Sequence, residues 1–276
     1  MSRTDYFMQM IDVKRLGAML PENPQRIRKL ISRGQPITFF NWICPPRTSI
    51  WIPDLTEPLA ACRFLRPGDG GFLESEPCRR LVDTEDETKT FLKMARECGI
   101  SFRYLKILAD DNPHRLYPRT LEIQGEKRIE EIFLEFFIWY QDKLDSLFGK
   151  GIEVVSWREL SAPYRELYEG IFNRPFDDIS SMLPKDIVEE EQRILAEHCG
   201  FQKDWQLQIK DFTERVIRSY AAEGVVFDAL ERDWVIPNQI LLCDESTRVF
   251  PAQIEAGRRL KGLDRLPKIF VLYPRR

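Results

Sequence analysis

The chain has 276 residues, of which 43% are hydrophobic and 31% charged, and its formal net charge is −3 at pH 7. This length suffices for one large domain with a buried core, and the nearly balanced charge excludes a global attraction to nucleic acid or membranes. Only two histidines occur, His114 and His198, so neither a histidine-rich metal site nor a histidine-dependent catalytic triad is expected.

The cysteines and the N-terminus indicate where the protein works. The six cysteines lie far apart, with no Cys-x-x-Cys pair, so reduced thiols in a cytoplasmic protein are expected. The first residues, MSRTDYFMQMIDVKRL, lack the apolar core of a signal peptide, and no run approaches 18 apolar residues. We therefore predict a soluble cytoplasmic protein that has no membrane partner.

Apolar segments alternate with helical patterns along the chain. The segment PITFFNWI is a continuous apolar run of the kind found in strands covered on both faces. Residues 66–90 are rich in glycine, proline and acids and are predicted to be a loop insertion. Strands are predicted at 36–43, 101–110, 152–160, 238–244 and 268–274. Helices are predicted at 21–34, 86–100, 119–148, 162–172, 184–201 and 203–230.

This alternation predicts the fold class. Strand, helix and strand in this spacing form βαβ units with a parallel sheet. We predict a single α/β domain over residues 1–276, built on a Rossmann-like parallel sheet flanked by helices.

The segment that follows the first predicted strand is a candidate site, because ligands of open parallel sheets bind beyond the carboxyl ends of the strands. Two consecutive prolines there precede Arg47, Thr48 and Ser49. A rigid turn of this kind could present a hydroxyl nucleophile, with backbone N–H groups nearby to stabilise an oxyanion. The alternative is a connecting loop whose hydroxyls cap the next element.

The second predicted strand ends in the sequence ILADDNPHRLYP. Asp110 and Asp111 at this strand end could bind a divalent cation, as paired carboxylates do in nucleotide-sugar transferases. The same residues followed by Asn-Pro are also typical of a turn, which is the interpretation we favour.

The helix predicted at 203–230 has one apolar face. Glu223 follows Tyr220 by three residues and Val216 by seven, so it continues this face toward the core. Burial of a carboxylate raises its pKa and makes it a plausible proton shuttle near neutral pH. A position at the helix rim, paired with Arg218 or Arg232, is the alternative. The apolar face comprises Trp205, Ile209, Phe212, Val216 and Tyr220.

Taken in order, these segments resemble the cyclodipeptide synthases that use aminoacyl-tRNA, which are relatives of class I aminoacyl-tRNA synthetase catalytic domains. The resemblance covers residues 35–273. In ICPPRTS, Cys44-Pro45 resembles the Ser-Pro of the family's nucleophile turn, and Ser49, or else Thr48, resembles the nucleophile.

The late helix and the segment after it extend the resemblance. Tyr220 and Glu223 in SYAAEGVVF resemble the family's Tyr and Glu, although the family spacing is Tyr-x-x-x-Glu and the spacing here is Tyr-x-x-Glu. Phe250-Pro251 in TRVFP resembles the family's strand-end pair of Tyr-Pro or Tyr-His, with Phe in place of Tyr.

The resemblance implies covalent acyl transfer without cofactor or metal. Ser49 would attack the ester of a first aminoacyl-tRNA, and Glu223 would relay protons when the amine of a second one attacks the aminoacyl-serine. Ring closure would release a diketopiperazine.

A tRNA substrate requires a basic surface. The first basic cluster, which we predict to bind tRNA, lies on the helix at 21–34. A divergent fungal branch of the family makes arginine-containing products. If this chain resembles that branch, one substrate is arginyl-tRNA, and its guanidinium would need an acidic wall supplied by Asp54, Glu57 or Asp110. The basic cluster comprises Arg26, Arg28, Lys29 and Arg33.

Two other classes of protein remain as alternatives. An isonitrile-synthase-like or glycosyltransferase-like enzyme would share the strand-end features, and the glycosyltransferase would depend on Mn²⁺ or Mg²⁺ held by Asp110. A noncatalytic RNA-binding α/β domain would retain tRNA without forming a covalent adduct.

Overall fold

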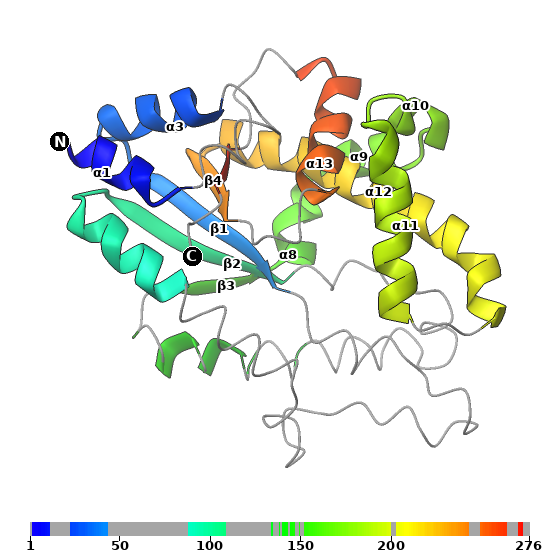
Figure 1. The fold of residues 1–276 in the computed structure, drawn as a ribbon, viewed down its shortest axis with the longest axis horizontal. Helices are drawn as coiled ribbons and strands as arrows, with labels where there is room; N and C mark the ends of the chain where they lie inside the picture. The colour runs from blue at the N-terminus through cyan, green and yellow to red at the C-terminus, as the bar shows by residue number, and fades with distance from the viewer. Residues whose placement is uncertain are drawn as a thin grey trace.

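The protein is an α/β molecule with helices on both faces of a parallel sheet (Figure 1). The computed structural model describes residues 2–11, 23–43, 88–108, 134, 138, 140–142, 144–146, 149, 152–199, 203–242, 249–263 and 270–272. The predicted fold class is confirmed. Most of the predicted insertion, residues 66–87, lies outside the described residues, and its last three residues belong to the helix at 88–97.

The described strands form a five-stranded sheet in the order β3-β2-β1-β4-β5, with every pair parallel. Strand β1 is central, so the strand order reverses between β1 and β4. In doubly wound sheets this reversal is the place where ligands bind, beyond the carboxyl ends of the strands. The strands are β1 (Ile37–Ile43), β2 (Phe102–Leu108), β3 (Glu153–Ser156), β4 (Gln239–Leu242) and β5 (Phe270–Leu272).

One predicted strand is wrong in its second half. The strand predicted at 152–160 ends at Ser156, and α8 (Trp157–Ser161) begins directly after it. The Ser156 hydroxyl accepts a hydrogen bond of 3.2 Å from the backbone N–H of Glu159, which satisfies one of the free donors at the helix start. The capping hydroxyl therefore outweighs the strand propensity of the residues that follow.

The first face of the sheet is covered by α1 (Arg3–Gln9) and the helix at 88–97. Phe39 of β1 packs edge-on against Phe91 at 5.7 Å and against Phe102 at 5.2 Å between ring centroids. Phe7 of α1 joins this aromatic cluster at 5.7 Å from Phe91. Helix α3 (Asn23–Ser32) lies beside α1 and contacts β5.

The second face of the sheet is covered by α12 (Lys203–Arg232). Phe227 of α12 packs at 5.0 Å from Phe40 of β1 and at 5.2 Å from Trp157 of α8. The Gln239 side chain of β4 donates a 2.6 Å hydrogen bond to the Phe227 carbonyl. These contacts fix the C-terminal third of α12 on the sheet.

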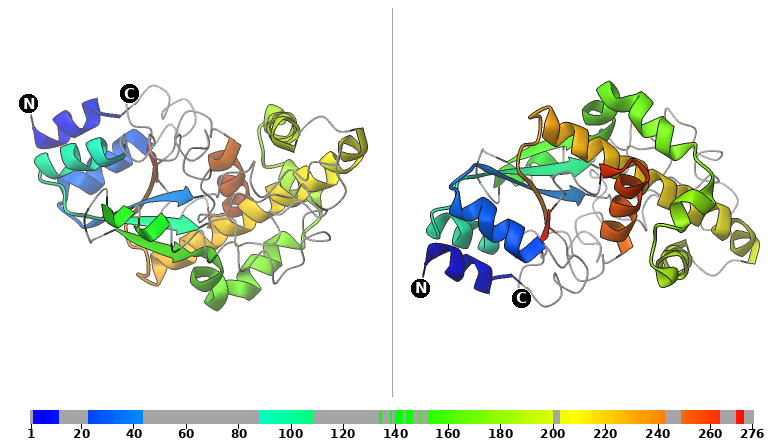
Figure 2. Two further views of the ribbon diagram at one scale, coloured as in Figure 1. Left: turned by 90° about the horizontal axis from the view of Figure 1, so that it is seen from below. Right: turned by 90° about the horizontal axis from the view of Figure 1, so that it is seen from above.

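The rest of α12 extends beyond the sheet into a group of helices, while α1 and α3 lie at the opposite end of the molecule (Figures 1 and 2). None of the helices that the structure describes is long and apolar enough to cross a membrane. The helices packed around α12 are α9 (Arg165–Phe172), α10 (Phe176–Ser180), α11 (Lys185–Cys199) and α13 (Val249–Leu260), and the short η2 (Ala162–Tyr164) joins α8 to α9.

The outer edge of β3 is occupied by a side chain. Gln141 donates from its amide nitrogen to the Ile152 carbonyl at 3.2 Å, and its amide oxygen accepts from the Val154 N–H at 3.2 Å. Gln141 thus makes the pair of hydrogen bonds that the backbone of a further strand would make.

Candidate active site

The inward face of α12 is the one that the sequence predicts. Ile209, Phe212 and Val216 are buried, and Tyr220 is half-buried. Their four-residue and three-residue spacing places them on one side of the helix. The helix therefore presents the residue that continues this face, Glu223, to the interior.

Glu223 is completely buried, with an exposed fraction of 0%. Its Oε1 accepts a hydrogen bond of 3.1 Å from Ser219 Oγ, one turn earlier on α12. Ser219 Oγ in turn accepts a hydrogen bond of 2.9 Å from the hydroxyl of Tyr168 on α9. The interior therefore contains a carboxylate connected to two hydroxyls in series.

The alternative position of Glu223 at the helix rim is wrong, because the side chain has no exposed surface. The arginines considered as its partners face other acids. Arg218 lies 3.8 Å from Glu214, and Arg232 donates to Asp233 at 3.1 Å.

Tyr220 and Phe250 meet although 30 positions separate them in the sequence. Their rings pack edge to face, with centroids 4.7 Å apart and planes at 73°. Phe250 and Pro251 lie in the first turn of α13, so their predicted place at a strand end is wrong. A proline is tolerated there because the first turn of a helix lacks internal acceptors for its N–H groups. Phe250 nevertheless contacts Tyr220.

The aromatic contact depends on a close crossing of α12 and α13. A Cβ atom on Gly257 would lie 1.9 Å from the Ala221 carbonyl oxygen, and one on Gly224 would lie 2.4 Å from the Ile254 carbonyl oxygen. Only glycine allows the two backbones to approach this closely. The crossing brings the start of α13 against the part of α12 that carries Tyr220 and Glu223.

A second buried glutamate lies between α11 and α13. Glu191 is 5% exposed, and its Oε2 accepts a 3.0 Å hydrogen bond from the amide of Gln253, which is fully buried. Gln253 follows Phe250 by one helical turn. The sequence analysis did not single out this pair, because it joins residues 62 positions apart on two different helices.

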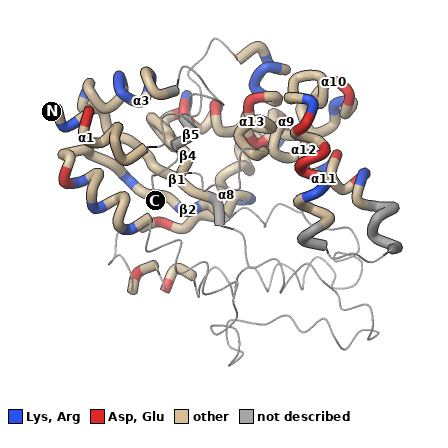
Figure 3. The backbone as a smooth tube through the Cα atoms, viewed as in Figure 1, with Lys and Arg blue, Asp and Glu red and all other residues tan. Residues whose placement is uncertain are grey.

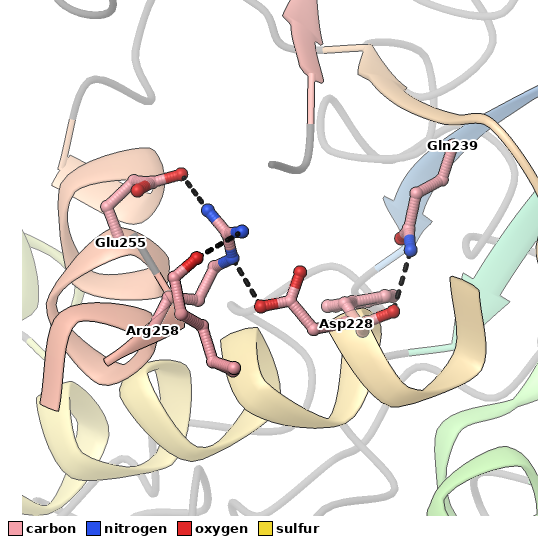
Figure 4. A network of polar contacts seen from close by, with 6 residues as sticks. Asp228, Gln239, Glu255 and Arg258 are labelled. Carbon is pink, nitrogen blue, oxygen red and sulfur yellow. Dashed lines mark hydrogen bonds and ion pairs between the residues drawn. The ribbon is translucent and has the colours of Figure 1, made fainter. Parts of the chain in front are cut away.

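A third buried polar group joins α12 to the end of α13 (Figure 4). Arg258 has no exposed surface; its Nε lies 2.5 Å from Asp228 Oδ2, and its Nη1 lies 2.8 Å from Glu255 Oε1. Among the described residues, Oδ1 of Asp228 has no hydrogen-bond partner. Burial raises the pKa of Asp228 to about 6 despite the adjacent guanidinium.

Glu231 lies one turn beyond Asp228 on α12. Burial, with a contribution from the charge of Asp228, raises the pKa of Glu231 to about 7. The backbone N–H of Gln239 and the guanidinium groups of Arg258 and Arg26 act in the opposite direction. Neither acid was predicted as a site residue, although both belong to the helix that the sequence identified as central.

The predicted nucleophile segment lies outside the described residues, as do Arg47, Thr48, Ser49, Asp54 and Asp110. The structure does place the strand ends that lead to these residues. Ile43, the last residue of β1, is the register partner of Leu108, the last residue of β2. The two predicted loops therefore start from neighbouring strands at the same edge of the sheet.

The predicted tRNA-binding cluster lies on α3 and the residue after it, where Figure 3 shows the Lys and Arg positions in blue, and two of its four cations interact with acids of the same chain. Arg28 forms an ion pair with Asp5 of α1. The hydrogen bond with the Ser2 hydroxyl lowers the pKa of Asp5 the most, and the Arg28 guanidinium lowers it further. Arg26 is close enough to act on Glu231. Lys29 and Arg33 are exposed.

In the described part of the chain, no three His, Cys, Asp or Glu side chains are grouped as metal ligands. Comparison with known proteins finds no family model and no curated protein that matches this chain.

Proposed function

We propose that the protein is an aminoacyl transferase that uses two aminoacyl-tRNAs to make a cyclodipeptide through an aminoacyl-Ser49 intermediate. The observation that carries this proposal is the completely buried Glu223, which accepts a hydrogen bond from Ser219 on the helix that covers the sheet. A buried carboxylate is costly unless it is paired or used. Its use here is proton transfer during peptide-bond formation in the cytoplasm, where aminoacyl-tRNAs occur.

The sheet order supports this assignment. Ser49 follows β1 by six residues, and β1 borders the reversal of strand order at which doubly wound sheets bind ligands. The Tyr220–Phe250 pair, formed from α12 and the helix after β4, is a plausible apolar wall for an aminoacyl side chain.

The residue four positions before Glu223 differs from the one in the family that this chain resembles. A tyrosine is expected there from the Tyr-x-x-x-Glu spacing, and this chain has Ser219. The hydroxyl of Ser219 reaches Glu223, and the phenol of Tyr168 reaches Ser219 from α9. A hydroxyl at the expected position and a nearby phenol are thus both present, supplied by two residues.

The proposed reaction has three acyl transfers. Ser49 Oγ attacks the first aminoacyl ester, the bond to the ribose oxygen breaks, and that oxygen leaves with the serine proton. The α-amine of the second aminoacyl-tRNA then attacks the aminoacyl-serine. Glu223 takes a proton from the amine and returns it to Ser49 as the serine leaves. The free amine of the resulting dipeptidyl-tRNA attacks its own ester, which releases tRNA and the diketopiperazine.

Intact-protein mass spectrometry after incubation with a pool of charged tRNAs tests the first step. We expect an added aminoacyl mass in the wild type that is absent in Ser49→Ala. An adduct that persists in Ser49→Ala and disappears in Thr48→Ala would place the nucleophile one residue earlier. An unchanged protein mass with every charged tRNA would overturn the proposed function.

Glu223→Gln tests the second step. We expect this variant to lower the rate of cyclodipeptide release by roughly 100-fold or more, the usual contribution of a general base. Glu191→Gln is the matched control, because Glu191 is also a buried glutamate that accepts a hydrogen bond from a neutral side chain. Equal losses in the two variants would show a general effect of changing a buried acid.

A further inference from the structure

The proposed reaction assigns no role to Tyr168 and Ser219, the two hydroxyls in series with Glu223. Both side chains are buried, with exposed fractions of 8% for Tyr168 and 0% for Ser219. They come from α9 and α12, and 51 positions separate them in the sequence. One of these buried hydroxyls donates to the Glu223 carboxylate, and the other donates to the first hydroxyl.

The two hydrogen bonds that link Tyr168, Ser219 and Glu223 both donate toward the carboxylate. Ser219 Oγ accepts the Tyr168 proton at 2.9 Å and donates its own proton to Glu223 Oε1 at 3.1 Å. Because a serine hydroxyl carries one proton, the bond from Tyr168 leaves that proton directed at Glu223. The carboxylate therefore receives a donor whose orientation is set from another helix.

A hydroxyl within a helix can also donate to a backbone carbonyl of the same helix, as Thr213 of α12 does. Thr213 Oγ1 donates to the Ile209 carbonyl at 2.7 Å, the usual bond of a helical hydroxyl to the carbonyl four residues earlier. Ser219 on the same helix donates to Glu223 and accepts from the phenol of Tyr168.

The Tyr168 ring is itself held in place. It stacks on Phe172, one turn later on α9, with centroids 5.8 Å apart and planes at 15°. Burial lowers the pKa of the half-buried Arg215 guanidinium, and the electrostatic effect of Tyr168 acts in the opposite direction without reversing this shift. Among the described residues, the titratable and charged groups in and beside this hydrogen-bonded series are Arg215 and Glu223 of α12 and Tyr168 of α9.

We propose that Tyr168 and Ser219 are positioning residues that orient the Glu223 carboxylate and stabilise its ionised form for proton uptake. This inference rests on the proposed role of Glu223 in acyl transfer. A hydrogen bond to a carboxylate favours the charged state, so its loss makes the carboxyl hold a proton at higher pH.

Carbon-13 NMR of δ-labelled glutamate tests the proposal, with Glu223→Gln identifying the Glu223 resonance. We expect Ser219→Ala to move the titration midpoint of Glu223 upward by about one pH unit, since a hydrogen bond to a charged group has this effect. Tyr168→Phe, which keeps the ring and its stacking, should move it in the same direction by less. The pH profile of cyclodipeptide release should shift by the same amounts.

Two further variants sharpen the test. Ser219→Thr keeps a hydroxyl and should retain the wild-type titration midpoint of Glu223. Thr213→Val removes a buried hydroxyl from the same helix and should also leave this midpoint unchanged. Wild-type midpoints in both Ser219→Ala and Tyr168→Phe would overturn this inference even if aminoacyl transfer occurs. The expected shifts in a protein that forms no aminoacyl adduct would support the hydroxyl chain and overturn the proposed function.

Discussion

At the scale of single residues, Asp228 and Glu231 make stability depend on pH. Their pKa values in the folded protein are raised to about 6 and about 7, whereas both carboxyls ionise near pH 4 in an unfolded chain. Between these limits the folded protein holds protons that the unfolded chain has lost. The contribution of these two carboxyls to the free energy of unfolding therefore decreases as the pH rises from about 4 to about 7.

We expect Asp228→Asn to remove much of this dependence. The shift at Asp228 corresponds to a change in unfolding free energy on the order of 3 kcal/mol across the window. Urea unfolding at pH 4.5, 5.5, 6.5 and 7.5 measures it. Asp211→Asn, an exposed acid on the same helix, is the control and should keep the wild-type slope. An unchanged slope in Asp228→Asn would contradict the assignment of the pH dependence to this carboxyl.

At the scale of helices and strands, the crossing of α12 and α13 sets the geometry of the candidate site. We expect Gly257→Ala to lower the free energy of unfolding by about 2 to 3 kcal/mol, because its Cβ would overlap the Ala221 carbonyl oxygen, which is part of the backbone. Thermal and chemical unfolding measure the change.

Gly170→Ala is the matched control for that prediction. Gly170 lies in α9, is exposed, and would place its Cβ in open space. Alanine is the better helix former, so this variant should be more stable by about 0.5 to 1 kcal/mol. A Gly257→Ala protein as stable as the wild type would show that the two helices can separate without cost.

The sequence predicts these elements to different degrees. Periodicity located α12 closely, because its apolar face repeats over many turns. The end of β3 was missed since Ser156 acts as a helix cap, and α13 was missed since Phe250-Pro251 was interpreted as a strand end. Both errors occur where a single local interaction decides between two structures.

The candidate site, too, could be predicted from the sequence only in part. The inward position of Glu223 follows from its spacing to Tyr220 and Val216 within one helix. The bond from Tyr168 to Ser219 spans 51 positions and depends on how α9 packs against α12. Contacts of this kind arise from tertiary packing, which no pattern along a single chain contains.

At the scale of the whole molecule, the proposal requires one surface that binds tRNA. Lys29 and Arg33 are exposed at the end of α3, whereas Arg28 is paired with Asp5. We expect Lys29→Ala and Arg33→Ala each to weaken tRNA binding for all tRNA sequences and to reduce the salt dependence of binding by about one ion. Titrations at several salt concentrations measure both effects.

Lys210→Ala is the control for this surface. Lys210 is exposed on the N-terminal half of α12, at the end of the molecule opposite α3 (Figure 1). Its removal lowers the net charge equally and should leave binding unchanged. Equal losses from all three variants would indicate a general effect of charge and would argue against α3 as the binding surface.

The amide of Gln141 has a consequence for how copies of this protein behave in a crowded cell. A strand with open donors and acceptors is a template for pairing with another chain, and such pairing leads to aggregation. One uncharged side chain closes this border of the sheet next to Ile152 and Val154. At this border, the donors and acceptors that could pair with another chain are satisfied by a residue that takes no part in the proposed chemistry.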